Sequence, residues 1–472
     1  MNENEESQQI QAEPIHGGSS SLKTTLAGVA GNILEWYDFT IFTEFSDIIA
    51  DNFFPPNQEG NTALLETFAV FGIAFIARPL GGVILGKMGD VHGRKGALEL
   101  SVFWMAFSTF AMGCLPTYET IGGFAPVLLI LMRLLQGLSV GGQLMSSVLF
   151  TLERSPLKKW GWKGSTVFGA ISIGVSIGSV IATIIRDTLT EQQVQTWGWR
   201  IPFWLGAFGA LPALYLKLQI KEISSSYDNV PNDNLTQEDG NNESAKDPVK
   251  ETFKKSHRRT LAATILAPTC NSVVYYLLFV WLVIFMNSII EPPIPHAFTI
   301  NSINGILGGI LLTLFGGWFA DWVGDYVKVM MMSGAILTIS APFAFSIFGG
   351  GGESYVGIIA FFIQLTLSIF LGTYLGAMVP WLVLITPPEI RLTSLSLGYN
   401  ISLSVWGGFS PLMATLLVDQ FGKIGPGYFI SLACVLGMFG VYIGPKKYYF
   451  PRSEHADEYT DVEENLSKPL LQ

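Results

Sequence analysis

Long apolar runs recur along the chain from residue 24 to residue 445. Most have roughly 20 residues or more, the length that a helix needs to cross a hydrocarbon core of about 30 Å. Only 14% of the residues are charged, whereas a soluble domain has about 25%. The sequence therefore predicts an all-α membrane protein with twelve transmembrane helices, at about 24–49, 62–86, 97–116, 124–150, 164–185, 200–219, 259–287, 297–319, 327–348, 355–385, 393–418 and 427–444.

Lysine and arginine predict the orientation, because loops on the cytosolic side of a membrane carry an excess of them. Most of the 27 such residues fall on the inner side if the N-terminus is cytosolic, so both termini are expected there. The stretch 221–258 is polar and rich in Asn, Asp and Ser, which is typical of a linker. We therefore expect two six-helix bundles, 24–220 and 259–445, joined by this cytosolic linker and flanked by acidic cytosolic tails at 1–23 and 446–472.

An internal repeat supports the division into two halves. GKMGDVHGRKGAL (86–98) follows the second run, and GWFADWVGDYVKV (317–329) follows the eighth. Asp90 aligns with Asp321 and Gly93 with Gly324, although the second copy lacks the basic end of the first. Repeated six-helix halves are typical of transporters built from parallel repeats.

Two acidic residues, Glu35 and Asp38, lie inside the first apolar run, in GNILEWYDFT (31–40). Three positions apart, they share one face of a helix, and a charge near the bilayer centre costs at least about 2.5–3.5 kcal/mol. The first half has two well-embedded cations, Arg78 and Arg133. Glu35 and Arg78 are both expected about 18 Å above the inner face. The four groups are therefore predicted to meet on the axis of the first half.

Three interpretations of this cluster stay open. The acids can be proton or substrate sites, since charged residues inside a membrane are by default functional. They can instead form a permanent salt-bridge cluster, or one acid can be held by an arginine while the other titrates. All five histidines lie in tails or loops, so carboxylates would have to carry any proton.

The second half has no deeply embedded charge, and its candidates are neutral. Aromatic faces in a cavity attract a quaternary ammonium group by cation–π interaction, whereas a single tryptophan more commonly packs against helices or lipid. No zinc motif, nucleotide-binding loop or Ser–His arrangement occurs in the chain, so we expect no enzyme, no nucleic-acid partner and no cofactor beyond a coupling proton. The polar and aromatic candidates are Asn271, Tyr275, Tyr276, Gln364, Tyr374, Tyr399, Asn400, Trp281, Trp381 and Trp406.

Several motifs together resemble a known family. Gly86, Asp90, Gly93, Arg94 and Lys95 form a G-x-x-x-D-x-x-G-R-K pattern similar to the inner loop between helices 2 and 3 of the major facilitator superfamily. Five further stretches, in the same order along the chain, resemble its metabolite:H+ symporter branch, which includes bacterial proline/betaine, α-ketoglutarate, citrate and shikimate transporters. They are GNILEWYDF (31–39), ARPLGGVILGKMGD (77–90), RLLQGLSVGG (133–142), WGWRIPFWLGA (197–207) and SLGYNISLSVWGGFSPLMATLL (396–417).

The resemblance implies a secondary active transporter that works by alternating access, with the two bundles rocking about a central site. The expected reaction is symport of H+ with a small polar organic solute, either an organic acid or a zwitterionic osmolyte or amino acid. A monomer in the plasma membrane is expected. The motif also implies an inner gate, in which Asp90 accepts hydrogen bonds from a helix N-terminus and Arg94 pairs across the two halves, with Asp321 and Gly324 as the second copy.

Two other functions stay open, and a departure from the resemblance suggests the first. The branch usually has Glu after Gly141-Gly142, and this chain has Gln143, which cannot carry a proton. An uncoupled facilitator of the same solutes is therefore one alternative. The other is of a different class, a transporter-like solute sensor that signals through the acidic tails. Besides the four charged residues, the candidates for solute or proton contact are Asn32, Gln143, Tyr276, Tyr399 and Asn400.

Overall fold

The computed structural model describes residues 19–55, 62–92, 94–206, 247–348 and 354–449. Both tails beyond these limits and most of the predicted linker lie outside the described residues. So do Gly93 and the side chains of Arg94 and Lys95, which means that the basic part of the first loop motif stays a prediction.

The described secondary structure is helical throughout. The first half contains α1 (Ser19–Glu44), α2 (Ser46–Phe53), α3 (Thr62–His92), α4 (Arg94–Cys114), α5 (Tyr118–Ile121), α6 (Phe124–Leu152), α7 (Trp160–Thr188) and α8 (Glu191–Gln193). A further helix starts at residue 200 and is described as far as residue 206.

The second half begins with α10 (Pro248–Thr252) and continues with helices that π-helical turns interrupt. Such turns are rare and often lie at functional sites. The α-helices are α11 (Arg258–Tyr276), α12 (Leu282–Ile284), α13 (Ala297–Ile306), α14 (Thr313–Val323), α15 (Tyr326–Ile347), α16 (Ser354–Ile385), α17 (Arg391–Ser402), α18 (Ser410–Phe421) and α19 (Gly425–Ile443). The π-helical turns are η4 (Leu277–Trp281), η5 (Phe285–Ile289), η6 (Leu307–Leu312) and η8 (Leu403–Gly407).

Helices lie at all the predicted spans, although only residues 200–206 of the sixth are described. Seven segments of the described chain are long and apolar enough to cross a membrane. These findings establish an all-helical membrane fold. The count of twelve crossings and the cytosolic position of the termini stay predictions.

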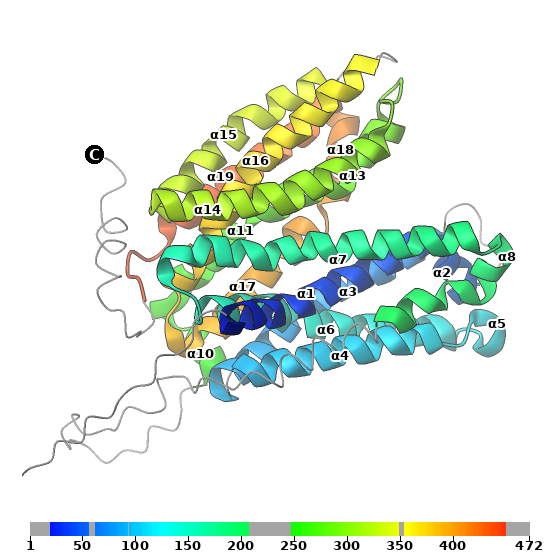
Figure 1. Cartoon of the computed structure of the whole chain (residues 1–472), viewed down its shortest axis with the longest axis horizontal. Coiled ribbons are helices and arrows are strands. Elements are labelled where there is room, and N and C mark those ends of the chain that lie inside the picture. The colour runs from blue at the N-terminus through cyan, green and yellow to red at the C-terminus, as the bar shows by residue number, and fades with distance from the viewer. Residues whose placement is uncertain (1–18, 56–61, 93, 207–246, 349–353, 450–472) are drawn as a thin grey trace, which may run out of the picture.

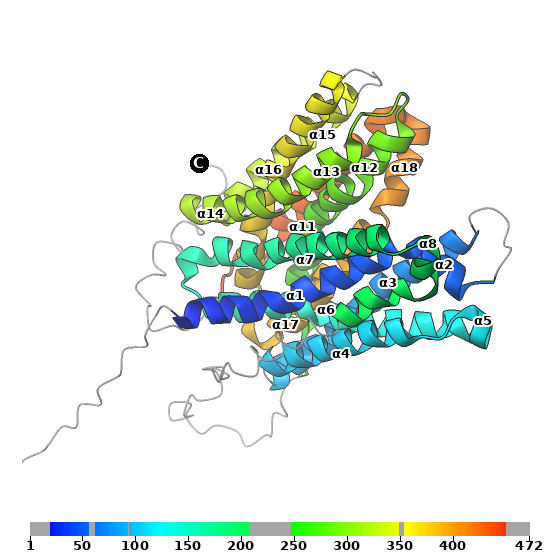
Figure 2. The same cartoon turned by 45° about the vertical axis from the view of Figure 1, so that its right-hand side comes forward.

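The two halves meet at one end of the molecule and diverge toward the other (Figures 1 and 2). We call the first the terminal end, because α1 begins there and α19 leads back to it, and we call the other the loop end, where α2, α5 and α8 lie. Glycines allow the halves to approach at the terminal end. A Cβ on Gly86 of α3 would lie 2.7 Å from Cα of Thr393 on α17, and one on Gly317 of α14 would overlap the backbone of Gly161 on α7.

Two aspartates join the halves at the terminal end in the same way. The carboxylate of Asp90, on α3, accepts hydrogen bonds from the backbone N–H groups of Leu392 (3.0 Å) and Thr393 (2.8 Å), in the first turn of α17. The carboxylate of Asp321, on α14, accepts them from Gly161 (2.7 Å) and Trp162 (2.8 Å), in the first turn of α7. A helix N-terminus has free N–H groups and a partial positive charge, so each contact is electrostatically favourable.

These two contacts are related by the internal repeat. Asp321 lies 231 positions after Asp90, and Leu392 lies 231 positions after Gly161. Each half therefore supplies one acceptor and one helix N-terminus to the other, and we call the two contacts the reciprocal locks. Gly324, which ends α14, has a φ of 72°, a left-handed conformation that favours glycine.

Further contacts tie the turn before α17 to its surroundings. Arg391 donates hydrogen bonds to the carbonyl oxygens of Thr386 (3.0 Å) and Tyr449 (3.1 Å), and its guanidinium lies 3.8 Å from the carboxylate of Glu153, at the end of α6. Beside it, Asp247 caps α10 and pairs with Lys87 at 3.2 Å, and the hydrogen bond from Lys87 lowers the pKa of Asp247. The terminal end is thus closed in this conformation.

Replacing Asp90 should open the terminal end. Asp90→Ala removes two hydrogen bonds to a charged acceptor, each worth about 1.5–3 kcal/mol, and about 1.4 kcal/mol changes an equilibrium tenfold. The reporter is the substitution Ser396→Cys, because Ser396 is fully buried in the α3–α17 seam. Its thiol should react at least about tenfold faster with a water-soluble maleimide when Asp90 is replaced. The exposed Cys114 is replaced by Ser in the background.

Asp325→Ala is the matched control for this experiment. Asp325 lies at the same end, but it caps its own helix by accepting a hydrogen bond from the N–H of Lys328 at 2.9 Å. Equal labelling at position 396 in the two variants would show that the Asp90 contact does not hold the halves together.

Candidate functional site

The structure brings the four predicted charged residues together. Glu35 and Asp38 on α1, Arg78 on α3 and Arg133 on α6 are each at most 1% exposed. An Nη atom of Arg78 lies 3.9 Å from the Glu35 carboxylate, and one of Arg133 lies 3.6 Å from the Asp38 carboxylate. They therefore form two ion pairs on neighbouring turns of α1.

The Asp38 carboxylate has a hydrogen-bond donor at each of its two oxygens. One carboxylate oxygen accepts a hydrogen bond from the Thr109 hydroxyl (2.8 Å) and the other from the Gln136 amide (2.7 Å). Arg133 donates to the Gln136 carbonyl oxygen at 2.9 Å and lies 3.3 Å from the centre of the Phe42 ring. A charge held by several hydrogen bonds and an aromatic face is stabilised as an ion.

The Glu35 pair is much looser. At 3.9 Å the contact with Arg78 is long for an ion pair, and Oε2 of Glu35 has no hydrogen-bond partner among the described residues. Aromatic faces hold Arg78 instead, since its guanidinium carbon lies 4.7 Å from the ring centre of Phe39 and 4.4 Å from that of Phe75. Its Nε and one Nη also have no hydrogen-bond acceptor in the described part of the chain. Both charges thus keep unused capacity to bind.

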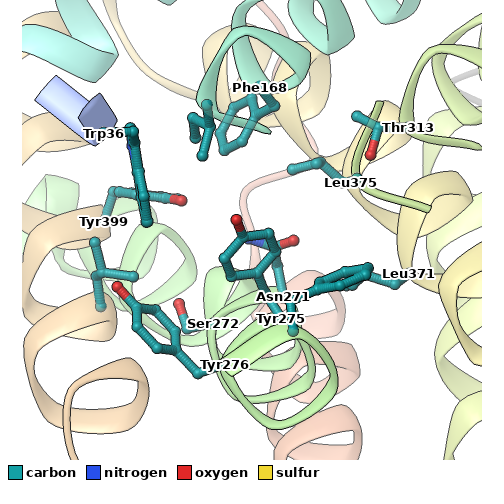
Figure 3. A pocket seen from close by; sticks show the side chains of 14 residues that line it. Trp36, Phe168, Asn271, Ser272, Tyr275, Tyr276, Thr313, Leu371, Leu375 and Tyr399 are labelled. Atoms are coloured by element: carbon teal, nitrogen blue, oxygen red, sulfur yellow. The ribbon is translucent and has the colours of Figure 1, made fainter. Parts of the chain in front are cut away.

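A small cavity lies between the two halves, and Figure 3 shows the side chains that line it. Its volume is about 30 Å³, room for about two water molecules. Trp36, next to Glu35 in the sequence, is one wall, and Phe168, Tyr275, Tyr276 and Tyr399 are others.

Three aromatic pairs close the space around the cavity, each with one ring from each half. Ring centres are 6.0 Å apart in Trp36–Tyr275, 6.2 Å in Phe168–Tyr399 and 6.2 Å in Phe75–Tyr276, and all three pairs are edge-on. Phe75 also contacts Arg78, so it links the ion pair to the cavity wall. The cavity further exposes Oδ1 of Asn271 and the Ser272 hydroxyl, neither of which has a hydrogen-bond partner among the described residues.

Several predicted candidates have other surroundings. Asn400 is not part of the cavity wall; it donates to the carbonyl oxygens of Gly141 and Ser396, both at 2.6 Å, and so ties α17 to α6. Gln364 bonds to Asn301 and to the backbone of η4, and the Tyr374 hydroxyl donates to the Ala267 carbonyl oxygen at 2.8 Å.

Four further candidates are buried away from the cavity wall. The tryptophans Trp281 and Trp381 are buried packing residues. Asn32 and Gln143 are fully buried, and neither of their amide groups has a hydrogen-bond partner in the described chain.

Four important residues were missed by reasoning from the sequence: Thr109, Gln136, Trp36 and Phe168. Gln136 had a usable signal, because it lies three positions after Arg133 and shares its helix face. Trp36 adjoins Glu35 within the GNILEWYDF motif. Thr109 and Phe168 carry no local signal, since only the packing of α4 and α7 places them. Among the described residues, no group of three or more His, Cys, Asp or Glu side chains is placed to hold a metal ion.

Comparisons with known proteins agree with this architecture. A family model described as Major Facilitator Superfamily matches residues 40–411. A Staphylococcus aureus (strain COL) protein is 34% identical over 419 residues, which cover 88% of this chain and 86% of the relative. The proline/betaine transporter of Salmonella typhimurium (strain LT2) is 31% identical over 421 residues, 88% of this chain and 82% of the relative.

Solved structures show the same fold at low sequence identity. The proton:xylose symporter XylE, bound to 6-bromo-6-deoxy-D-glucose, superposes with a TM-score of 0.67 at 16% identity and covers 90% of this chain and 95% of its own. A bacterial homologue of the iron transporter ferroportin gives 0.66 at 11% identity, covering 89% and 98%. The chain therefore belongs to the major facilitator superfamily, and it is a multi-pass integral membrane transport protein, not an enzyme.

Proposed function

We propose that this protein carries a small zwitterionic solute of the proline and betaine class together with a proton across the plasma membrane, as a monomer, by alternating access. The relatives that are named as proline/betaine transporters support the solute class. The observation that carries the proposal is the loose Glu35–Arg78 pair, which Phe75 links to Tyr276 in the wall of an aromatic cavity between the halves.

The cavity and Arg78 suit the two ends of such a solute. Trp36, Tyr275 and Tyr276 offer ring faces to an ammonium group, an interaction worth about 0.5–2 kcal/mol. Arg78, which two aromatic rings hold in place, offers unused N–H donors to a carboxylate. At about 30 Å³ the cavity is too small for the whole solute, so the aromatic pairs must separate when it enters.

Glu35 provides a physical link between proton and solute. When its carboxylate is charged, it balances Arg78, and a solute carboxylate would have to compete with it. When Glu35 binds a proton, Arg78 lacks a counter-ion in a membrane interior, where an unbalanced charge is costly. The solute carboxylate then restores the balance. Proton and solute therefore bind together, and each inward proton releases about 2.3 kcal/mol per 100 mV.

Asp38 has a different role in this proposal. Its hydrogen bonds from Thr109 and Gln136 and its pairing with Arg133 favour a permanent ion pair that holds α1, α4 and α6 together. Of the three interpretations that the sequence leaves open, the geometry favours the mixed one, with Asp38 structural and Glu35 titrating.

The reciprocal locks would form the inner gate if the termini are cytosolic, with Arg94 and Lys95 adding to it. The conformation described here then has its inner side shut. An uncoupled facilitator is the second candidate, and the observation that favours it is Gln143, a neutral buried residue where the symporter branch has a carboxylate.

Glu35→Gln should separate solute movement from proton movement, because the amide fills the same space but cannot take a proton. In proteoliposomes with a trapped pH dye, betaine, proline, α-ketoglutarate, citrate and shikimate are added one at a time. The unmodified protein should acidify the lumen with betaine or proline, and the variant should lose at least about tenfold of this signal. Counterflow of labelled solute, which needs no net proton transfer, should persist. Normal acidification by the variant would rule out Glu35 as the proton carrier.

Asp38→Asn should damage the fold more than the coupling. Removing one partner of a buried ion pair costs about 3–5 kcal/mol, since the other charge stays buried without balance. The variant should unfold in detergent at a clearly lower temperature than Glu35→Gln, because Asp38 also accepts hydrogen bonds at both oxygens whereas Oε2 of Glu35 accepts none among the described residues. Similar unfolding temperatures for the two variants would contradict this division of roles.

Trp36→Leu should weaken the binding of a quaternary ammonium solute. Loss of about 1–2 kcal/mol of cation–π attraction corresponds to a rise in KM for betaine of about five- to thirtyfold. Trp318→Leu is the control, because Trp318 lies on the outer face of α14 and is 51% exposed. An unchanged KM in Trp36→Leu would remove the ammonium group from this wall of the cavity.

A further inference from the structure

One face of α6 carries a row of polar side chains that reaches from the ion pairs to the terminal end. Gln143, Ser147 and Thr151 follow one another at four-residue intervals and share the face of Arg133 and Gln136. Each of the three is at most 1% exposed, and none of their side-chain polar atoms has a hydrogen-bond partner among the described residues. We call these three residues and Asn32 of α1 the polar row.

Two neighbouring serines behave differently. Ser146, on α6, donates to the Gly142 carbonyl oxygen at 2.6 Å, and Ser155, in the turn after α6, donates to that of Thr151 at 2.8 Å, so both are satisfied by backbone carbonyl oxygens of α6. Ser147 and Thr151 could do the same but do not. A buried polar group without a partner costs about 1–3 kcal/mol, and such groups are normally satisfied by ordered water. The polar row therefore points to water between α6 and its neighbours.

The register of the helices places this row on the side of Glu35 that faces the terminal end. α1 and α6 run in opposite directions, and the Asp38–Gln136 hydrogen bond fixes them side by side. Asn32 lies six residues from Asp38 toward the terminal end, and Gln143 lies seven residues from Gln136 in the same direction. Asn32 and Gln143 are therefore at about the same height. Both amides lack partners among the described residues, and Asn32 precedes Glu35 by one turn. From Gln143 to Thr151 the row extends about 12 Å.

A charged contact between the halves lies at about the height of the far end of the row, on a different face of α6. Thr151 lies two positions before Glu153, whose carboxylate pairs with the buried guanidinium of Arg391 at 3.8 Å. Arg391 also donates to the carbonyl oxygens of Thr386 and Tyr449. The Glu153–Arg391 contact joins the two halves and must break when the terminal end opens.

We infer that the polar row is a hydrated path by which the proton on Glu35 leaves toward the terminal end, separate from the route of the solute. This inference rests on the proposed role of Glu35. The proton passes along hydrogen-bonded water, each oxygen receiving one proton and giving up another, and Glu35 regains its charge. Arg78 is then balanced again by Glu35 and releases the solute carboxylate.

The experiment compares two double variants. Ser147→Ala with Thr151→Val removes two hydroxyl groups from the row, and Ser146→Ala with Ser155→Ala removes two that bond to backbone carbonyl oxygens of α6. In the proteoliposome assay, the first variant should reduce solute-driven proton entry at least about fivefold while solute counterflow stays within about twofold. The second should keep both. In the unmodified protein, D2O should slow proton entry and leave counterflow unchanged, a measurement that needs no variant to fold.

Each other outcome overturns the inference. Normal proton entry in the Ser147/Thr151 variant would show that the row is not used. A parallel loss of proton entry and counterflow would mean that these residues line the route of the solute, and an equal effect of D2O on both would mean the same. Glu35→Gln is measured beside them. If it couples normally, the proposed function fails, whatever the row does; if only the Ser147/Thr151 variant couples normally, the row alone fails.

Discussion

An arginine inside a membrane needs its charge balanced, and the organisation of this protein follows from two different ways of doing so. Arg133 is bound by Asp38, Gln136 and a phenylalanine face. Arg78 is held by two aromatic rings and has only a distant carboxylate as its counter-ion. The first arrangement fixes three helices of one bundle. The second leaves a charge that a third group can claim, and it lies where the bundles meet around an aromatic cavity. The acid whose ion pair stabilises the bundle and the acid whose arginine can change its partner thus lie on neighbouring turns of α1.

The internal repeat shows a second division of roles, between the two halves of the chain. Both halves contribute equally to the reciprocal locks, so the mechanical contact is symmetric. The buried charges, in contrast, are not distributed symmetrically between the halves. Gln364 lies 231 positions after Arg133, and in the second half it joins a neutral amide network with Asn304 and the backbone of η4. The second half therefore shapes the cavity with rings and amides, whereas the first half supplies its charge.

The fold class and the meeting of Glu35, Asp38, Arg78 and Arg133 could be predicted, because each depends only on distance along a helix axis. Helix length against bilayer thickness gives the spans, and height above the inner face places the charges. The inequality of the two ion pairs could not be predicted, since it depends on Thr109 from α4 and on the ring planes of Phe39 and Phe75. Asn400 shows the same limit: its motif suggested a binding residue, but the close approach of α17 to Gly141 makes it a tie between helices. A sequence pattern does not predict how the helices pack side by side.

Both reciprocal locks use main-chain donors, at residues 392 and 393 and at residues 161 and 162. An aspartate that binds backbone amides does not bond to the side chains at those positions, although a Cβ at Gly161 would lie 2.5 Å from the Gly317 carbonyl oxygen. The surfaces at the starts of α7 and α17 can therefore diverge between the halves, as Gly161-Trp162 and Leu392-Thr393 have done, while the closure itself is retained. Among substitutions at these four donors, only proline removes the N–H group on which the closure depends. Two acidic residues, together with the close glycine packing beside them, are therefore what the closure of the terminal end requires.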